Sequence, residues 1–120
     1  MSTIQTVAED TFANALEQPG VLVIDFWAPW CGPCRAMAPQ FERAAQLRPQ
    51  YPFAKVNVDE QPALAGKLQI RSIPTLVVIR DGEVIGTSPG AIGADQLVAA
   101  LDRLAPTPEP ETALAEGATQ

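Results

Sequence analysis

The stretch FWAPWCGPCRAMAP, residues 26–39, contains both cysteines of the chain. Cys31 and Cys34 are separated by a glycine and a proline, and the run VLVIDFWA at residues 21–28 leads directly into them. A run that is apolar at nearly every position is typical of a strand covered on both faces. From Cys34 onward the apolar residues recur at helical spacing. We therefore expect the cysteine pair at the point where a central strand passes into a helix.

The remaining segments predict alternating strands and helices. We expect an edge strand at 3–8, a helix with Asp10 as its N-cap, a strand at 53–59, a helix opened by Pro62, a hairpin after 75–79 through Asp81-Gly82, and a last helix ending before Pro106. The resulting order, βαβαβαββα, predicts an α/β fold in which a mixed central sheet is flanked by helices.

Length and charge narrow the possible classes of protein. A chain of 120 residues has room for one domain, which we expect at residues 1–105, followed by a disordered acidic, proline-rich tail at 106–120. The net charge of −6 repels phosphate backbones and anionic lipid, so we expect no nucleic-acid partner. The apolar runs are far shorter than the roughly 20 residues that span a bilayer. Because the first residues show no export signal, we expect a cytoplasmic protein without a membrane partner.

A Cys-x-x-Cys pair has three possible chemical roles. A structural zinc site needs four ligands, mostly Cys and His, whereas this chain has two cysteines and no histidine. A structural disulfide across so short a loop removes little entropy from the unfolded chain. A redox centre is therefore favoured, although a metal site completed by carboxylates or by a second chain stays open.

The expected position makes the two cysteines unequal. Gly32 permits a tight turn, and Pro33 suits the first helical positions. Cys31 would face the free N–H groups and the positive end of the helix dipole, which favour a thiolate. Cys34, one turn further along, is within bridging reach but shielded. We expect Cys31 to be the exposed nucleophile that attacks a substrate disulfide, and Cys34 to resolve the mixed disulfide.

Several segments together resemble the thioredoxin family. They are DFWAPWCGPCRAMAP, KVNVDEQP, IRSIPTLVV, RDGEV and Gly90-Ala91, in the family's order and spacing over about residues 3–105. The combination is similar to the second class of bacterial thioredoxins, but the N-terminal zinc ribbon usual in that class is missing from this sequence. The resemblance implies a thioredoxin fold and a protein-disulfide reductase, because Gly-Pro between the cysteines is the reductase pattern.

The resemblance also implies roles for residues outside the cysteine pair. Asp25 interrupts a buried strand, where its pKa should be raised. By resemblance it accepts the proton of Cys34, and the ammonium of Lys55 on the neighbouring strand approaches Asp25 and tunes it. Pro74 is expected to follow a cis peptide bond and to pack against the cysteines, with Ile73 offering its backbone to substrate. The implied substrate-binding residues are Trp30, Gly32, Pro33, Ile73, Pro74, Gly90 and Ala91.

Two neighbouring residues carry less specific expectations. We expect Trp27 to serve mainly in packing. Pro89 precedes Gly90 at a position where thioredoxins commonly have a backbone donor, so this departure bears on partner preference.

The resemblance implies no bound cofactor, because the cysteines themselves carry the electrons. It implies NADPH as their source, through a flavin-dependent thioredoxin reductase, and disulfide-containing proteins as targets of a monomer. Two alternatives stay open, namely a non-catalytic binding subunit that does not need its cysteines and a metal carrier that uses them as ligands.

Overall fold

A five-stranded mixed sheet forms the centre of the computed structural model, which describes residues 4–104. The elements in chain order are β1 (Gln5–Thr6), α1 (Glu9–Glu17), β2 (Val21–Trp27), α2 (Gly32–Leu47), β3 (Phe53–Asn57), α3 (Pro62–Lys67), β4 (Thr75–Arg80), β5 (Glu83–Pro89) and α4 (Ala94–Leu104). This order confirms the predicted βαβαβαββα arrangement and the α/β class. The predicted tail at 106–120 lies outside the described residues.

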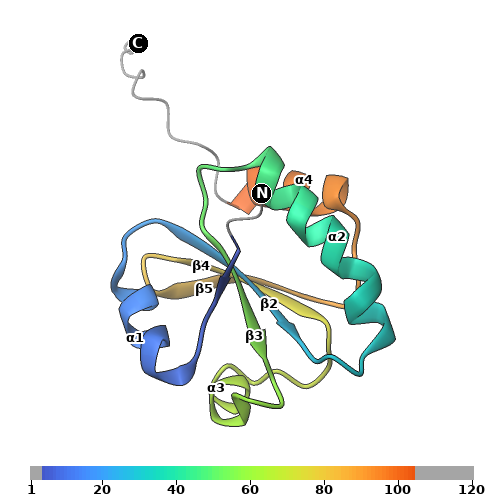
Figure 1. Ribbon diagram of the computed structural model, residues 1–120. Coiled ribbons are helices and arrows are strands. Elements are labelled where there is room, and N and C mark those ends of the chain that lie inside the picture. The colour runs from blue at the N-terminus through green and yellow to red at the C-terminus, as the bar shows by residue number, and fades with distance from the viewer. Residues whose placement is uncertain (1–3, 105–120) are drawn as a thin grey trace.

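The strand order is β1-β3-β2-β4-β5, with β2 in the middle. β3 pairs in parallel with both β1 and β2, whereas β4 is antiparallel to β2 and to β5. Helices α2 and α4 lie on one side of the sheet, and α1 and α3 lie on the other (Figure 1). The sheet therefore has helices over both faces, which is why β2 is apolar at nearly every position.

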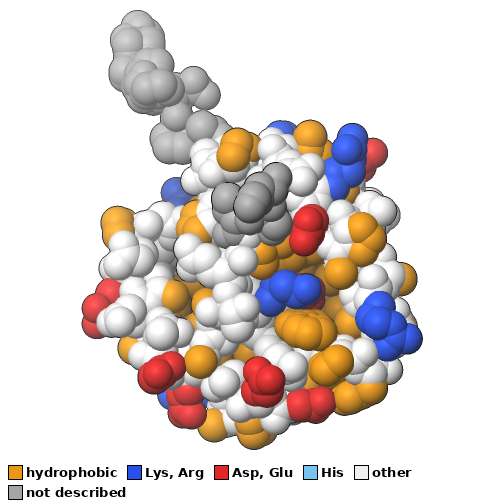
Figure 2. All heavy atoms as spheres, in the orientation of Figure 1, with side chains coloured by type: hydrophobic (Ala, Val, Ile, Leu, Met, Phe, Trp, Pro, Cys, Tyr) orange, Lys and Arg blue, Asp and Glu red, His pale blue; other side chains and the backbone are white. Residues whose placement is uncertain are grey.

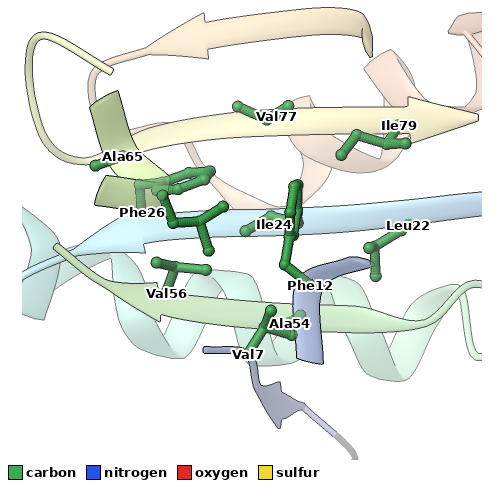
Figure 3. Close-up of a cluster of buried hydrophobic side chains, with 11 residues drawn as sticks. Val7, Phe12, Leu22, Ile24, Phe26, Ala54, Val56, Ala65, Val77 and Ile79 are labelled. Carbon is green, nitrogen blue, oxygen red and sulfur yellow. The ribbon is translucent and has the colours of Figure 1, made fainter. Parts of the chain in front are cut away.

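The alternation of side chains along β2 divides its residues between two cores. Leu22, Ile24 and Phe26 pack with Phe12 of α1 and with strand residues of the same face, as Figure 3 shows. On the other face Val23 packs beneath α2 and α4 in a second core. This core also contains the edge-to-face pair Phe41 and Phe53, whose ring centroids are 5.2 Å apart. Because successive strand residues point to opposite faces, Asp25 and Trp27 share the face that α2 covers.

The edge strand predicted at 3–8 is shorter, covering only Gln5–Thr6. Two other predicted boundaries are also wrong, and in both cases a local side chain explains the difference. Helix α1 begins at Glu9 with Ala8 as N-cap, not Asp10. The hydroxyl of Thr11 accepts from the Ala8 N–H at 3.1 Å, and the acidic side chains lie in the first turn instead. Strand β3 ends at Asn57, two residues early, because its Oδ1 accepts the N–H of Asp59 at 2.9 Å and turns the chain.

The hairpin between β4 and β5 forms where the sequence predicts it. Asp81 and Gly82 both have positive φ, at 51° and 85°, as a two-residue turn between twisted strands requires. The Asp81 carboxylate also accepts the Gly20 N–H at 2.7 Å, while the Asp81 N–H donates to the Gly20 carbonyl at 2.9 Å. The turn is thus bonded to the loop that leads into β2.

We expect Gly82→Ala to lower the free energy of unfolding by about 1 kcal/mol or more. Its φ of 85° disfavours any Cβ, and that atom would lie 3.3 Å from the Leu16 carbonyl oxygen. Gly66→Ala is the matched control, because a Cβ there meets nothing within 4 Å and alanine is the better helix former. Urea denaturation of both variants checks this, and an equal loss in both would contradict it.

Candidate active site

The cysteine pair lies at the junction of β2 and α2, as predicted. Cys31 is the N-cap of α2, and its sulfur accepts the backbone N–H of Cys34 at 3.1 Å. The two residues form a disulfide with a Cα–Cα distance of 5.2 Å. A sulfur held by a helix N-terminal N–H group is stabilised as a thiolate once the disulfide is reduced. The geometry therefore favours Cys31 as the nucleophile.

The expected exposure of Cys31 is wrong for this disulfide form. Its side chain is 5% exposed and that of Cys34 is 2% exposed. Both sulfurs join a small apolar cluster with Ala28, against which Trp27 and Ile73 pack. Because the bond holds Cys31 against Cys34 and this cluster, the two residues differ little in exposure, and the helix N-terminus distinguishes them instead.

The predicted segment around Pro74 faces the disulfide. The Ile73–Pro74 peptide bond is cis, as the resemblance implied, and the Ile73 carbonyl oxygen lies 3.9 Å from the Cys31 sulfur. The Gly90 N–H donates to the Pro74 carbonyl at 2.8 Å. This bond joins the two predicted loops, so Ile73, Pro74 and Gly90 are brought together, with Ala91 next in the chain.

Trp30, which directly precedes Cys31, forms an exposed apolar surface beside the disulfide. Its side chain is 67% exposed, and its indole N–H donates to the Asp59 carboxylate at 2.7 Å. A depression of about 200 Å³ lies between Trp30 and Ile73, floored by apolar residues and bordered by Arg71 and Ser72. The hydrogen bond fixes the indole while leaving it accessible to a ligand.

Asp25 is buried without a hydrogen-bond partner. Its side chain is 1% exposed, and neither carboxylate oxygen has a partner among the described residues. Burial raises its pKa from 3.8 to about 6, with the positive charge of Lys55 opposing part of the increase. A carboxyl group in this state takes up and releases a proton near neutral pH.

The resemblance implied that the ammonium of Lys55 approaches Asp25. The two residues are register partners on β2 and β3, and Lys55 acts on the pKa of Asp25 through its charge. Its ammonium nevertheless lies over the Trp27 ring, 4.7 Å from the centroid. Sequence reasoning missed this contact, although the position of Trp27 two residues after Asp25 on one strand was a signal for it.

The charges around the site are mixed. The Arg35 guanidinium donates to the Pro29 carbonyl at 2.8 Å and so ties helix α2 to the loop before it. On the face shown in Figure 2, acidic side chains gather along the lower edge, whereas basic side chains are scattered over the centre, the right and the top. Within residues 4–104 no group of three or more His, Cys, Asp and Glu side chains is arranged to hold a metal ion.

Comparisons with known proteins agree with the site geometry. The family model described as Thioredoxin matches residues 3–103. Thioredoxin 1 of Synechococcus elongatus is 43% identical over 105 residues, covering 86% of this chain and 98% of the relative. The thioredoxin of Streptomyces clavuligerus is 42% identical, covering 88% and 95%, and that of Bacillus subtilis is 46% identical, covering 69% and 81%.

A solved structure is also similar to this protein. It comes from a study of the thiol resolving mechanism in yeast mitochondrial 1-Cys peroxiredoxin via glutathione/thioredoxin systems, and it matches with a TM-score of 0.79 at 34% identity. The match covers 87% of this chain and 100% of the other. With its fold, its bonded cysteine pair and these relatives, the chain belongs to the thioredoxin family of thiol–disulfide oxidoreductases.

Proposed function

We propose that this protein reduces disulfides of target proteins in the cytoplasm and is itself reduced by a flavin-dependent thioredoxin reductase with electrons from NADPH. The observation that carries the proposal is the bond from the Cys34 N–H to the Cys31 sulfur at the start of α2. It supports Cys31 as the attacking thiolate and leaves Cys34 one turn away to close the disulfide.

The exchange proceeds in two displacements. The thiolate of Cys31 attacks one sulfur of a substrate disulfide, forms a mixed disulfide and releases the other substrate sulfur as a thiolate, which takes a proton from solvent. Cys34 then gives its proton to Asp25 and attacks the Cys31 sulfur. The second substrate sulfur leaves as a thiolate, and the Cys31–Cys34 disulfide described above is formed. Two electrons pass to the substrate, and no bound cofactor is required.

Asp25 supports this second step because of its environment. A carboxylate with a pKa of about 6 is a stronger base than an exposed aspartate, yet it is largely ionised at neutral pH. Asp25 is buried on the face of the sheet that α2 covers, and α2 is the helix that carries Cys34. Lys55 tunes this basicity through its charge.

Substrate binding is proposed for the residues on either side of the disulfide. Ile73 lies outside β4, so its backbone is not part of the sheet ladder and is suited to pairing with an extended peptide. Trp30 and Pro74 contribute apolar walls, together with Gly32 and Pro33 in the first turn of α2 and with Gly90 and Ala91 in the loop after β5. Such a surface selects for an accessible disulfide and backbone more than for particular side chains.

We further propose that residues 1–105 form the catalytic domain of a monomer and that residues 106–120 are a separate acidic tail. The family match over residues 3–103 supports this boundary. The net charge of −6 argues against nucleic acid or anionic membrane as partners.

No helix within the described part of the chain has the length and apolar character needed to cross a bilayer.

Asp25→Asn is expected to stabilise the oxidised protein at pH 8 by about 3 kcal/mol, since one pKa unit corresponds to about 1.4 kcal/mol. The unfolded carboxyl group ionises near 3.8 and the folded one near about 6, so the folded protein binds the extra proton between these values. Stability of the natural protein therefore falls as pH rises through this window. Below pH 4 the advantage of the variant should vanish.

Urea denaturation at pH 4 and pH 8 measures this difference. The exposed Asp10→Asn control should show no pH-dependent gain. An Asp25→Asn variant with unchanged stability at both pH values would argue that the carboxyl group is not desolvated.

Cys34→Ser is expected to accumulate mixed disulfides between Cys31 and target proteins, because the resolving thiol is gone. Non-reducing electrophoresis after incubation with cell extract measures them, and a reducing agent should release the targets. Cys31→Ser is the matched control and should give no adducts. A reactive Cys31 thiol that forms no adducts with protein disulfides would refute the reductase proposal.

Reduction of the protein by NADPH and a bacterial thioredoxin reductase should consume one NADPH per Cys31–Cys34 disulfide, followed as loss of NADPH absorbance. The variant with both cysteines changed to serine should consume none. If the reductase turns over other thioredoxins but leaves this disulfide intact, the electrons must come from another donor.

A further inference from the structure

The pairing of β2 and β3 brings a lysine beside a buried aspartate. Asp25 and Lys55 are register partners in parallel strands, so their side chains leave the sheet on the same face. An ammonium in that position would ordinarily donate to the carboxylate and hold it in the ionised form. Here both oxygens of Asp25 lack a hydrogen-bond partner within the described residues.

The ammonium of Lys55 instead contacts an aromatic ring. It lies 4.7 Å from the centroid of Trp27, which follows Asp25 by two residues on the same strand and face. Trp gives the strongest attraction for a cation among the aromatic side chains. A buried ion pair would require both charges to be desolvated, whereas over the ring the half-buried lysine keeps part of its hydration.

The position of this ammonium affects the pKa of Asp25, because burial raises that pKa and the charge of Lys55 opposes part of the increase. On β3 the neighbour of Asp25 is Lys55, and on β4 it is the apolar Leu76. Helix α2 contributes Cys34, which carries a titratable thiol only after reduction. The buried residues of α4 are apolar. Lys55 is thus the charged group that acts on Asp25 in the described part of the chain.

We propose that Trp27 is a positioning residue for proton transfer: its indole ring holds the Lys55 ammonium out of hydrogen-bond contact with Asp25, and this keeps Asp25 able to accept a proton from Cys34. The contact with Lys55 is a role beyond packing. The inference rests on the proton-acceptor role proposed above for Asp25, but the position of the ammonium is measurable independently of it.

The ring affects the basicity of Asp25 because it sets how closely the Lys55 ammonium approaches the Asp25 carboxylate. A carboxylate that accepted a hydrogen bond from Lys55 would be stabilised as the anion and would be a weaker base toward a thiol. With no cation nearby, the carboxyl group would stay protonated to higher pH. Holding the ammonium over Trp27 keeps the pKa of Asp25 between these two limits.

A double-mutant cycle tests the proposal by NMR titration of the Asp25 side-chain carboxyl carbon in the oxidised protein. The four proteins are the natural chain, Trp27→Leu, Lys55→Met and the double variant. Trp27→Leu frees the ammonium and should lower the pKa of Asp25 by about one unit. In the Lys55→Met background the same change should shift it by less than half as much.

Each outcome of the cycle bears on the proposal. An equal decrease in both backgrounds would overturn it, because water entering the space left by the ring would then be the cause. No shift, or an increase, in Trp27→Leu would also overturn it. Trp27→Phe keeps an aromatic ring and should return the pKa most of the way to that of the natural protein. If Trp27→Leu fails to fold, Trp27→Met takes its place in the cycle.

Kinetics separate this inference from the role of Asp25. In Trp27→Leu the pH midpoint of disulfide exchange should fall in parallel with the pKa of Asp25, whereas Lys55→Met should raise it. If Asp25→Asn kept the natural pH profile, the proton-acceptor role would fail, while the NMR cycle would still decide whether Trp27 positions Lys55.

Discussion

The parallel pairing of β2 with β3 is the constraint on which both the fold and the site depend. The register sets Asp25 opposite Lys55, and the two-residue period of the strand sends Trp27 to the same face. Because that period is two, a slip of one residue would carry Asp25 into the apolar core beneath α1 and α3 and bring Ile24 and Phe26 beneath α2. The chemistry therefore depends on strand register as much as on residue identity.

At the junction of β2 and α2, a single helix provides the environment that the cysteines require for thiolate chemistry. Helix α2 offers backbone N–H groups at its first turn, and Cys31 occupies the N-cap where one of them reaches its sulfur at 3.1 Å. The same helix covers the face that contains Asp25. One element thus stabilises the attacking thiolate and desolvates the carboxyl group, and the second effect opposes folding at neutral pH, since burial of an ionised carboxylate is unfavourable.

The loops facing the disulfide are held by backbone bonds more than by side chains. Pro89 pairs with Thr75 at the end of the edge strand β5, a position where proline is tolerated. The next residue, Gly90, supplies the N–H that Pro89 lacks and bonds the Pro74 carbonyl at 2.8 Å. Its φ of 91° is one that glycine adopts readily. The unusual proline is therefore accommodated without loss of this link.

The sequence by itself determined the order of elements, the Asp81-Gly82 hairpin and the position of the cysteines at a strand-to-helix junction, because each follows from local periodicity and turn chemistry. It also indicated a raised pKa for Asp25, since a carboxylate in an apolar strand is desolvated. Only the tertiary structure decided the burial of Cys31 and the placement of the Lys55 ammonium. Both depend on contacts between segments far apart in the chain, Ile73 with Cys31 and Lys55 with Trp27, and the distances of these contacts are set only when the folded sheet and its loops pack together.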